Sequence, residues 1–171
     1  YGNVYNMKLP GIYAAYALIL AVFGQTHTAV HTGLLVINAV TILLIFLFGR
    51  KLFDPFTGLC ASAAFAVLSL GQSVQGIFAN AGHFVIVFGM LGILLLVRGI
   101  EGRKRWSLAA GAVSWGICLL MKQHGAAFIV FGGLYLILSN IRRREPDFKA
   151  IAADGSIYLA GVLAPFVITC L

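Results

Sequence analysis

Residues 82–105 read GHFVIVFGMLGILLLVRGIEGRKR, a long apolar run that ends in a basic cluster. From Gly82 to Val97 the run has no formally charged residue, and Arg98 and the Arg-Lys-Arg triplet at 103–105 follow it. About 20 apolar residues cross the hydrocarbon core of a bilayer as a helix, and basic residues collect on the cytoplasmic side. The stretch therefore predicts a spanning helix that ends in the cytoplasm.

The composition of the whole chain agrees with a membrane protein. Of its 171 residues, 61% are hydrophobic and 10% charged, and the mean hydropathy is +0.98, whereas a soluble domain carries about 25% charged residues. The net charge of +7 comes from residues that flank apolar runs, so we expect no nucleic-acid partner. Cys60, Cys118 and Cys170 lie in apolar runs without metal-ligand spacing and are predicted to be small buried residues. Neither a divalent metal nor another cofactor is indicated.

The basic residues also predict the topology of the chain. Ten of the twelve lysines and arginines lie at alternate ends of the apolar segments, the pattern of a polytopic membrane protein with its short basic loops in the cytoplasm. We predict one all-α membrane domain over 1–171, an internal segment of a longer protein. An interfacial helix is expected on the outer face over about 11–23, between Pro10 and Gly24. Six spans are expected over about 29–48, 57–75, 82–97, 106–121, 125–138 and 151–171.

The two remaining cations and all four histidines are predicted to lie at the outer face. Lys8, Lys122, His27, His31, His83 and His124 occur there, whereas the five acidic residues fall on or near the cytoplasmic side. A cationic surface without a carboxylate favours an anion, and a lipid phosphate is the obvious candidate. The two lysines are far apart in the sequence, so only folding could bring them together.

Each of these residues also has a simpler explanation. A single outer lysine is often an interface anchor whose ammonium group reaches the headgroups. His27 and His31 have the i, i+4 spacing of a metal pair, but no third ligand follows at a recognisable spacing. His83 could cap the helix that begins beside it. The three consecutive polar residues at 122–124 make a poor membrane turn unless they line a cavity.

Several short motifs resemble those of the integral-membrane GT-C glycosyltransferases, specifically those related to protein O-mannosyltransferases and lipid A aminoarabinose transferases. In these enzymes a Lys-x-Pro-Gly element in the first outer loop leads into an outer-face helix, a span ends in Gly-Arg-Arg/Lys-Leu-Phe, and a short Lys-containing outer turn joins two later spans. The matching stretches here are Lys8–Tyr13, Phe23–Gly24, Gly49–Phe53 and Met121–Gly125. The resemblance covers nearly the whole chain in order and spacing.

The resemblance implies an inverting transferase that takes a sugar from a polyprenyl-phosphate donor at the outer membrane face. The family's Lys-x-Pro lysine is implicated in holding the lipid phosphate, which carries over to Lys8 and more weakly to Lys122. The family's catalytic Asp precedes that lysine, so we expect it upstream of residue 1. Many members also have an acidic residue at the start of the span where this chain has Gly82 and His83. That role is therefore vacant or differently filled.

We therefore expect a glycosyltransferase of the cell envelope, in the bacterial inner membrane, acting on a lipid-linked sugar and an envelope acceptor from the periplasmic side. Lys8, Lys122 and His124 are predicted to bind the donor phosphate, and Tyr13, Asn80, His83 and Gln123 to line the pocket. A flippase-like transporter of a lipid-linked or anionic solute is an alternative, but no inverted repeat is visible. A catalytically inactive scaffold of the same family is another, which the departure at Gly82 keeps open.

The topology gives a direct prediction. Residues 1–28, 72–81 and 122–124 should face the periplasm or the cell exterior, because the basic clusters hold the other loops inside. In a cysteine-free background, single cysteines at 25 and 123 should react with an impermeant thiol reagent in intact cells. Strong labelling of a cysteine at 103 or 143 would overturn the topology.

Overall fold

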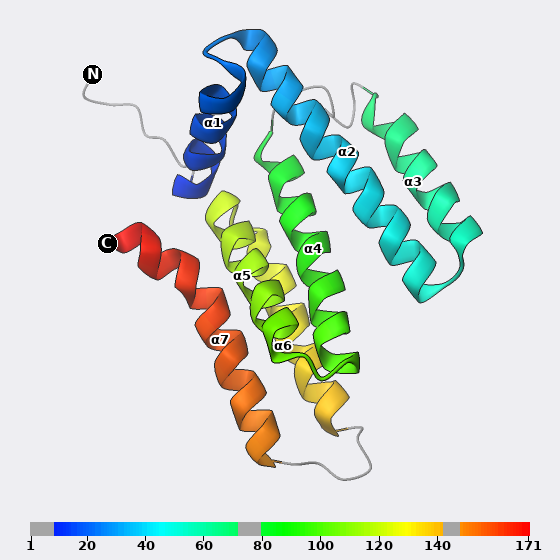
Figure 1. The fold of residues 1–171 in the computed structure, drawn as a ribbon, viewed down its shortest axis with the longest axis vertical. Coiled ribbons are helices and arrows are strands. Elements are labelled where there is room, and N and C mark those ends of the chain that lie inside the picture. The colour runs from blue at the N-terminus through cyan, green and yellow to red at the C-terminus, as the bar shows by residue number, and fades with distance from the viewer. Residues whose placement is uncertain (1–8, 72–79, 142–147) are drawn as a thin grey trace.

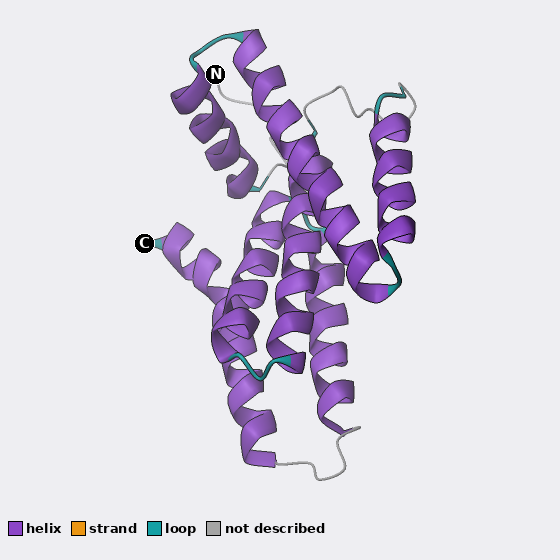
Figure 2. Ribbon diagram, turned by 45° about the vertical axis from the view of Figure 1, so that its right-hand side comes forward, coloured by secondary structure: helices purple, strands orange, loops and turns teal. Residues whose placement is uncertain are grey.

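The computed structural model describes residues 9–71, 80–141 and 148–171, and there the chain forms seven α-helices and no strand (Figure 2). The helices are α1 (Pro10–Phe23), α2 (His27–Leu52), α3 (Pro55–Ser69), α4 (Ala81–Glu101), α5 (Arg105–Met121), α6 (Gly125–Ile141) and α7 (Phe148–Cys170). The predicted all-α fold is confirmed. Residues 72–75 of the predicted second span lie outside the described ranges.

The helices form an antiparallel bundle around α5. This helix contacts α1, α4, α6 and α7, while α2 packs on α4 and α3 packs on α2 (Figure 1). Successive helices from α2 to α7 run in opposite directions. The N-terminal ends of α4 and α6 therefore lie at the same end of the bundle as the C-terminal end of α5. We call this the Lys122 end, after the α5–α6 turn. The opposite end, with the α4–α5 turn, is the basic end.

Local sequence signals set several helix boundaries. Pro10 is the first residue of α1, and Gly24, with φ +91°, follows the last residue in the left-handed region that glycine tolerates. Asp54 caps α3, accepting hydrogen bonds from the backbone N–H and hydroxyl of Thr57 at 2.9 and 2.6 Å. These bonds lower the pKa of Asp54. Pro55 follows this cap as the first residue of α3.

The centre of the bundle is the indole of Trp115 on α5, which has no exposed surface. Its Nε1–H donates to the carbonyl oxygen of Gly89 on α4 at 3.0 Å, and its ring meets that of Tyr158 on α7 edge to face, with centroids 6.1 Å apart. A Cβ added at Gly92 on α4 or Gly132 on α6 would overlap the indole. Glycine on two helices therefore makes the space in which one large side chain joins four helices.

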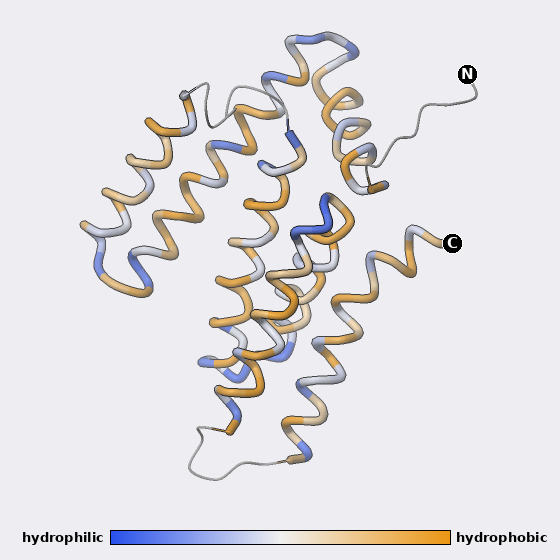
Figure 3. Tube along the Cα trace, turned by 180° about the vertical axis from the view of Figure 1, so that it is seen from behind, coloured by the Kyte–Doolittle hydropathy of each residue, from blue (hydrophilic) through white to orange (hydrophobic). Residues whose placement is uncertain are grey.

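Three helices are long and apolar enough to cross a membrane, namely α2, α4 and α7. The others that were predicted to span have 15 residues in α3 and 17 in α5 and α6. At 1.5 Å per residue, 17 residues extend about 26 Å, close to the lower limit for a bilayer core of about 30 Å. Many large apolar residues are exposed on the outside of the bundle, and hydrophobic positions recur along every helix (Figure 3). The number of six spans remains a prediction.

Two ion pairs join helix ends at the basic end. Lys51 Nζ lies 2.6 Å from Glu101 Oε2, and Arg105 Nε lies 3.4 Å from Asp154 Oδ1. Partly exposed pairs of this kind contribute little to stability. They nevertheless show that the C-terminal end of α2 lies beside the C-terminal end of α4, and that the start of α5 lies beside α7. All carboxylates within the described ranges, Asp54 included, belong to this end of the bundle.

The prediction that all three cysteines are buried is wrong for two of them. Cys118 on α5 is buried and its Sγ lies 3.4 Å from the carbonyl oxygen of Val85, whereas Cys60 on α3 and Cys170 at the end of α7 are exposed. Both exposed residues belong to helices at the edge of the bundle. An apolar residue in a membrane protein can face lipid as readily as protein, so hydropathy alone does not predict burial.

The packing of Trp115 predicts that Gly132→Ala will destabilise the protein, because the new methyl group must displace the indole. Overpacking of this kind costs about 3 kcal/mol. Gly155→Ala on α7 is the matched control, since a Cβ there meets nothing within 4 Å. Thermal unfolding of the full-length protein in detergent should show a lower Tm for Gly132→Ala and an unchanged or slightly higher Tm for Gly155→Ala. Equal Tm values would contradict the role of Trp115.

Candidate functional site

Three segments that carry predicted site residues converge at the Lys122 end. Ile12 on α1, Phe84 on α4 and Met121 on α5 belong to one buried apolar cluster. A Cβ added at Gly11 would lie 2.7 Å from the carbonyl oxygen of Leu120, so the first turn of α1 lies directly against the last turn of α5. Folding therefore brings the Pro10–Gly11 element beside the Lys122 turn, although about 110 residues of sequence separate them.

Backbone hydrogen bonds shape the Lys122 turn. Lys122 is extended, with φ −161° and ψ 145°, and its N–H donates to the carbonyl of Cys118 at 3.2 Å. Its own carbonyl accepts from Gly125 N–H at 2.9 Å, which closes the turn into α6. A Cβ at Gly125 would lie 2.7 Å from the carbonyl oxygen of Cys118, so glycine is required there. Lys122 is half-buried, and Gln123 and His124 are exposed.

The other predicted site residues occupy different positions. Lys8 lies outside the described residues, two positions before Pro10 in the sequence. Tyr13 is an exposed residue of α1. Asn80, not His83, caps α4, and its side-chain oxygen accepts from Gly82 N–H at 3.4 Å. His83 is half-buried in the first turn of that helix. The ligand and pocket roles of these residues remain predictions.

The histidine pair at the start of α2 gains no further metal ligand. His27 and His31 are exposed, and within the described ranges no group of three or more His, Cys, Asp or Glu side chains comes together in a metal-binding arrangement. Thr26 caps this helix by accepting from Ala29 N–H at 3.1 Å.

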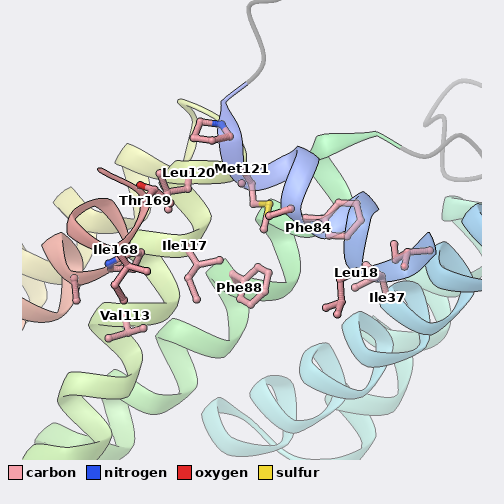
Figure 4. A pocket seen from close by; sticks show the side chains of 17 residues that line it. Leu18, Ile37, Phe84, Phe88, Val113, Ile117, Leu120, Met121, Ile168 and Thr169 are labelled. Carbon is pink, nitrogen blue, oxygen red and sulfur yellow. The ribbon is translucent and has the colours of Figure 1, made fainter. Parts of the chain in front are cut away.

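An apolar groove of about 600 Å³ begins beside the Lys122 turn. In Figure 4, Phe88 of α4 and Ile117 of α5 point into the space between Leu18 of α1 and Ile168 of α7. The full lining is Pro10, Gly11, Ala14, Ala15, Leu18, Ile19, Ile37, Phe84, Phe88, Val113, Ile117, Leu120, Met121, Ala164, Pro165, Ile168 and Thr169. Its volume lies within the range of small-molecule sites, about 300–1,000 Å³.

The groove extends from the Lys122 end towards the middle of the bundle. On α5 its lining extends from Met121 to Val113, a distance of about 12 Å at 1.5 Å per residue. Pro165 lies inside α7, where its ring packs on Gly116 of α5. Because an internal proline removes a helical hydrogen bond and bends the helix, the last turns of α7 turn away from α5 (Figure 1). This bend makes room for the groove.

Sequence reasoning missed the groove entirely. Every position in its lining except Thr169 is an aliphatic, aromatic, Met, Pro or Gly residue, and such residues are ordinary for a membrane helix. Pro165 was the available signal, because a proline inside an apolar span indicates a bend.

Together, the apolar helices and the separated polar ends define an integral membrane protein. The sequence profile of the family described as dolichyl-phosphate-mannose-protein mannosyltransferase matches residues 8–168, and the chain belongs to this family. This membership confirms the resemblance to the GT-C glycosyltransferases that the sequence motifs indicate.

A relative is known from rice. The chain is 28% identical over 166 residues to the dolichyl-diphosphooligosaccharide–protein glycosyltransferase subunit STT3B of Oryza sativa subsp. japonica. The alignment covers 90% of this chain and 22% of that protein, so the chain spans less than a quarter of the relative's length. No solved structure matches the chain.

Proposed function

We propose that this chain forms the donor-binding part of a transferase that moves a sugar from a polyprenyl phosphate to an acceptor at the outer membrane face. The apolar groove takes the first isoprenoid units of the donor, and the Lys122 end takes its phosphate. The partners are the lipid-linked sugar and an acceptor of the cell envelope. The active side is the periplasmic or extracellular face of the bacterial inner membrane.

One observation carries this proposal, namely the groove that begins directly beside the half-buried Lys122. Leu120 and Met121 line the groove, and Lys122 is the next residue. A lipid phosphate has an apolar tail joined to an anion, and the site offers an apolar channel joined to a cation. The described carboxylates all lie at the opposite end, so they do not repel an anion here.

The chemistry is a direct displacement at the anomeric carbon. A carboxylate base, expected upstream of Lys8, accepts the proton of the acceptor hydroxyl as its oxygen attacks, and the bond from the sugar to the lipid phosphate breaks. Negative charge then grows on the departing phosphate. Lys8 and Lys122, with His124 two residues after Lys122, stabilise this charge, so their contribution is larger in the transition state than in the ground state.

The phosphate role of the lysines predicts unequal losses of activity. Lys8→Ala should abolish transfer, and Lys8→Arg should keep part of it, because arginine retains the charge but not the compact ammonium group. Lys122→Ala should lower kcat/KM about tenfold, as expected for one hydrogen bond to a charged group. Lys51→Ala, at the basic end, is the control and should leave kcat/KM unchanged in the full-length enzyme with a polyprenyl-phosphate sugar. Full turnover by Lys8→Ala would contradict the phosphate role and show that Lys8 is only an interface anchor.

The groove predicts a separate effect on donor affinity. Ala164→Trp should fill the space between α5 and α7 and raise the donor KM about tenfold, because the tail loses part of its buried apolar area. Leu163→Trp is the matched control, since Leu163 is 56% exposed on the outside of α7 and does not line the groove. The donor KM of both variants should be measured by steady-state kinetics after an unchanged Tm has been confirmed. Equal donor KM values would contradict binding of the donor tail in the groove.

A further inference from the structure

The carboxylates at the basic end already have partners within the protein. Glu101 pairs with Lys51, Asp154 pairs with Arg105, and Asp54 accepts from Thr57. The remaining cations there include Arg98, Arg103 and Lys104, all exposed and all within one helix end and its turn. The α4–α5 turn therefore carries a cluster of positive charges that no carboxylate in the described part of the protein neutralises.

Backbone geometry makes this turn unusual. The backbone N–H of Lys104 donates to the carbonyl of Gly99 at 2.9 Å, and that of Gly102 donates to the carbonyl of Arg98 at 3.0 Å. This pattern ends a helix whose C-cap is followed by a left-handed residue. The left-handed residue is Arg103, with φ +50°, and it is the one described non-glycine residue with a positive φ. Glycine normally takes this place because a side chain is strained there. Here Gly102 stands one position earlier, with an ordinary φ of −86°.

An arginine, rather than a glycine, occupies the left-handed position of this turn. Residues held in unfavourable backbone conformations tend to persist where their side chains are needed. Arg103 is exposed and lies between Arg98 and Lys104 in the sequence. Trp106, two residues past Lys104, is 63% exposed, as expected of an indole at the membrane–water interface.

We propose that Arg98, Arg103 and Lys104 bind the phosphate of an anionic phospholipid in the leaflet at the basic end, with Trp106 against its glycerol and upper acyl region. Guanidinium and ammonium groups are the usual partners of lipid phosphates, and basic juxtamembrane segments are attracted to anionic leaflets. The site lies at the opposite end of the bundle from the donor groove, and it stands whether or not the proposed transfer reaction is correct.

Lipid retention tests the site on the full-length protein. In native mass spectrometry from mixed phosphatidylglycerol and phosphatidylcholine micelles, Arg103→Asn combined with Lys104→Gln should retain one phosphatidylglycerol fewer than the wild type. Asparagine tolerates the left-handed conformation, so the change removes charge without new strain. Arg103→Lys alone keeps the positive charge, so it should retain the wild-type number of phosphatidylglycerol molecules. Arg50→Gln is the control and should retain the wild-type number, because the Arg50 guanidinium already lies 5.6 Å from the Phe46 ring centroid.

Relief of the strain provides a second readout. In phosphatidylcholine nanodiscs Arg103→Gly should raise the Tm, because glycine adopts the left-handed conformation freely. Adding phosphatidylglycerol should raise the Tm of the wild type but change that of Arg103→Gly much less. Equal retention by the double variant and the wild type would overturn the proposal. An equal Tm rise from inorganic phosphate in phosphatidylcholine nanodiscs would also overturn it, because the site would then bind a soluble anion.

Discussion

The structure depends on the enclosure of one indole ring. Trp115 is fully buried, donates its N–H to α4, and fits only because Gly92 and Gly132 present no side chain to it. In a bilayer, apolar surface gains little by leaving lipid for protein, so helices associate through close packing and buried hydrogen bonds. Trp115 donates the hydrogen bond to α4 and packs closely against α4, α6 and α7, and it thereby fixes the position of α5.

The position of α5 then determines the site. Its last turn receives the first turn of α1 at Gly11, and it continues into the Lys122 turn, which closes tightly because Gly125 has no side chain. Pro165 bends α7 away from the same helix. The groove and the half-buried lysine beside it are thus two consequences of how one helix is held. This arrangement supports binding of a lipid with an anionic head at that end.

The two ends of the bundle differ in how they treat charge. At the basic end each described carboxylate has a partner, and the left-handed Arg103 belongs to the surplus of exposed cations in the α4–α5 turn. At the Lys122 end the cation is half-buried beside an apolar channel. The first arrangement is suited to holding the protein in an anionic leaflet, and the second to binding a particular lipid-linked anion. Both proposals use the same attraction between cation and phosphate, with different degrees of burial.

The amino-acid sequence was enough to predict the all-α membrane class, the family and several helix ends. Proline and glycine act on their own backbone, so α1 begins at Pro10 and ends just before Gly24, as expected. The packing of the helices was needed to establish which apolar residues face a groove and which cysteines face outward. The physical reason is that lipid, a neighbouring helix and an apolar groove all accept the same side chains, so the composition of a membrane helix cannot distinguish among them. The meeting of α1 with the end of α5 depends on contacts between residues far apart in the chain, which no local pattern encodes.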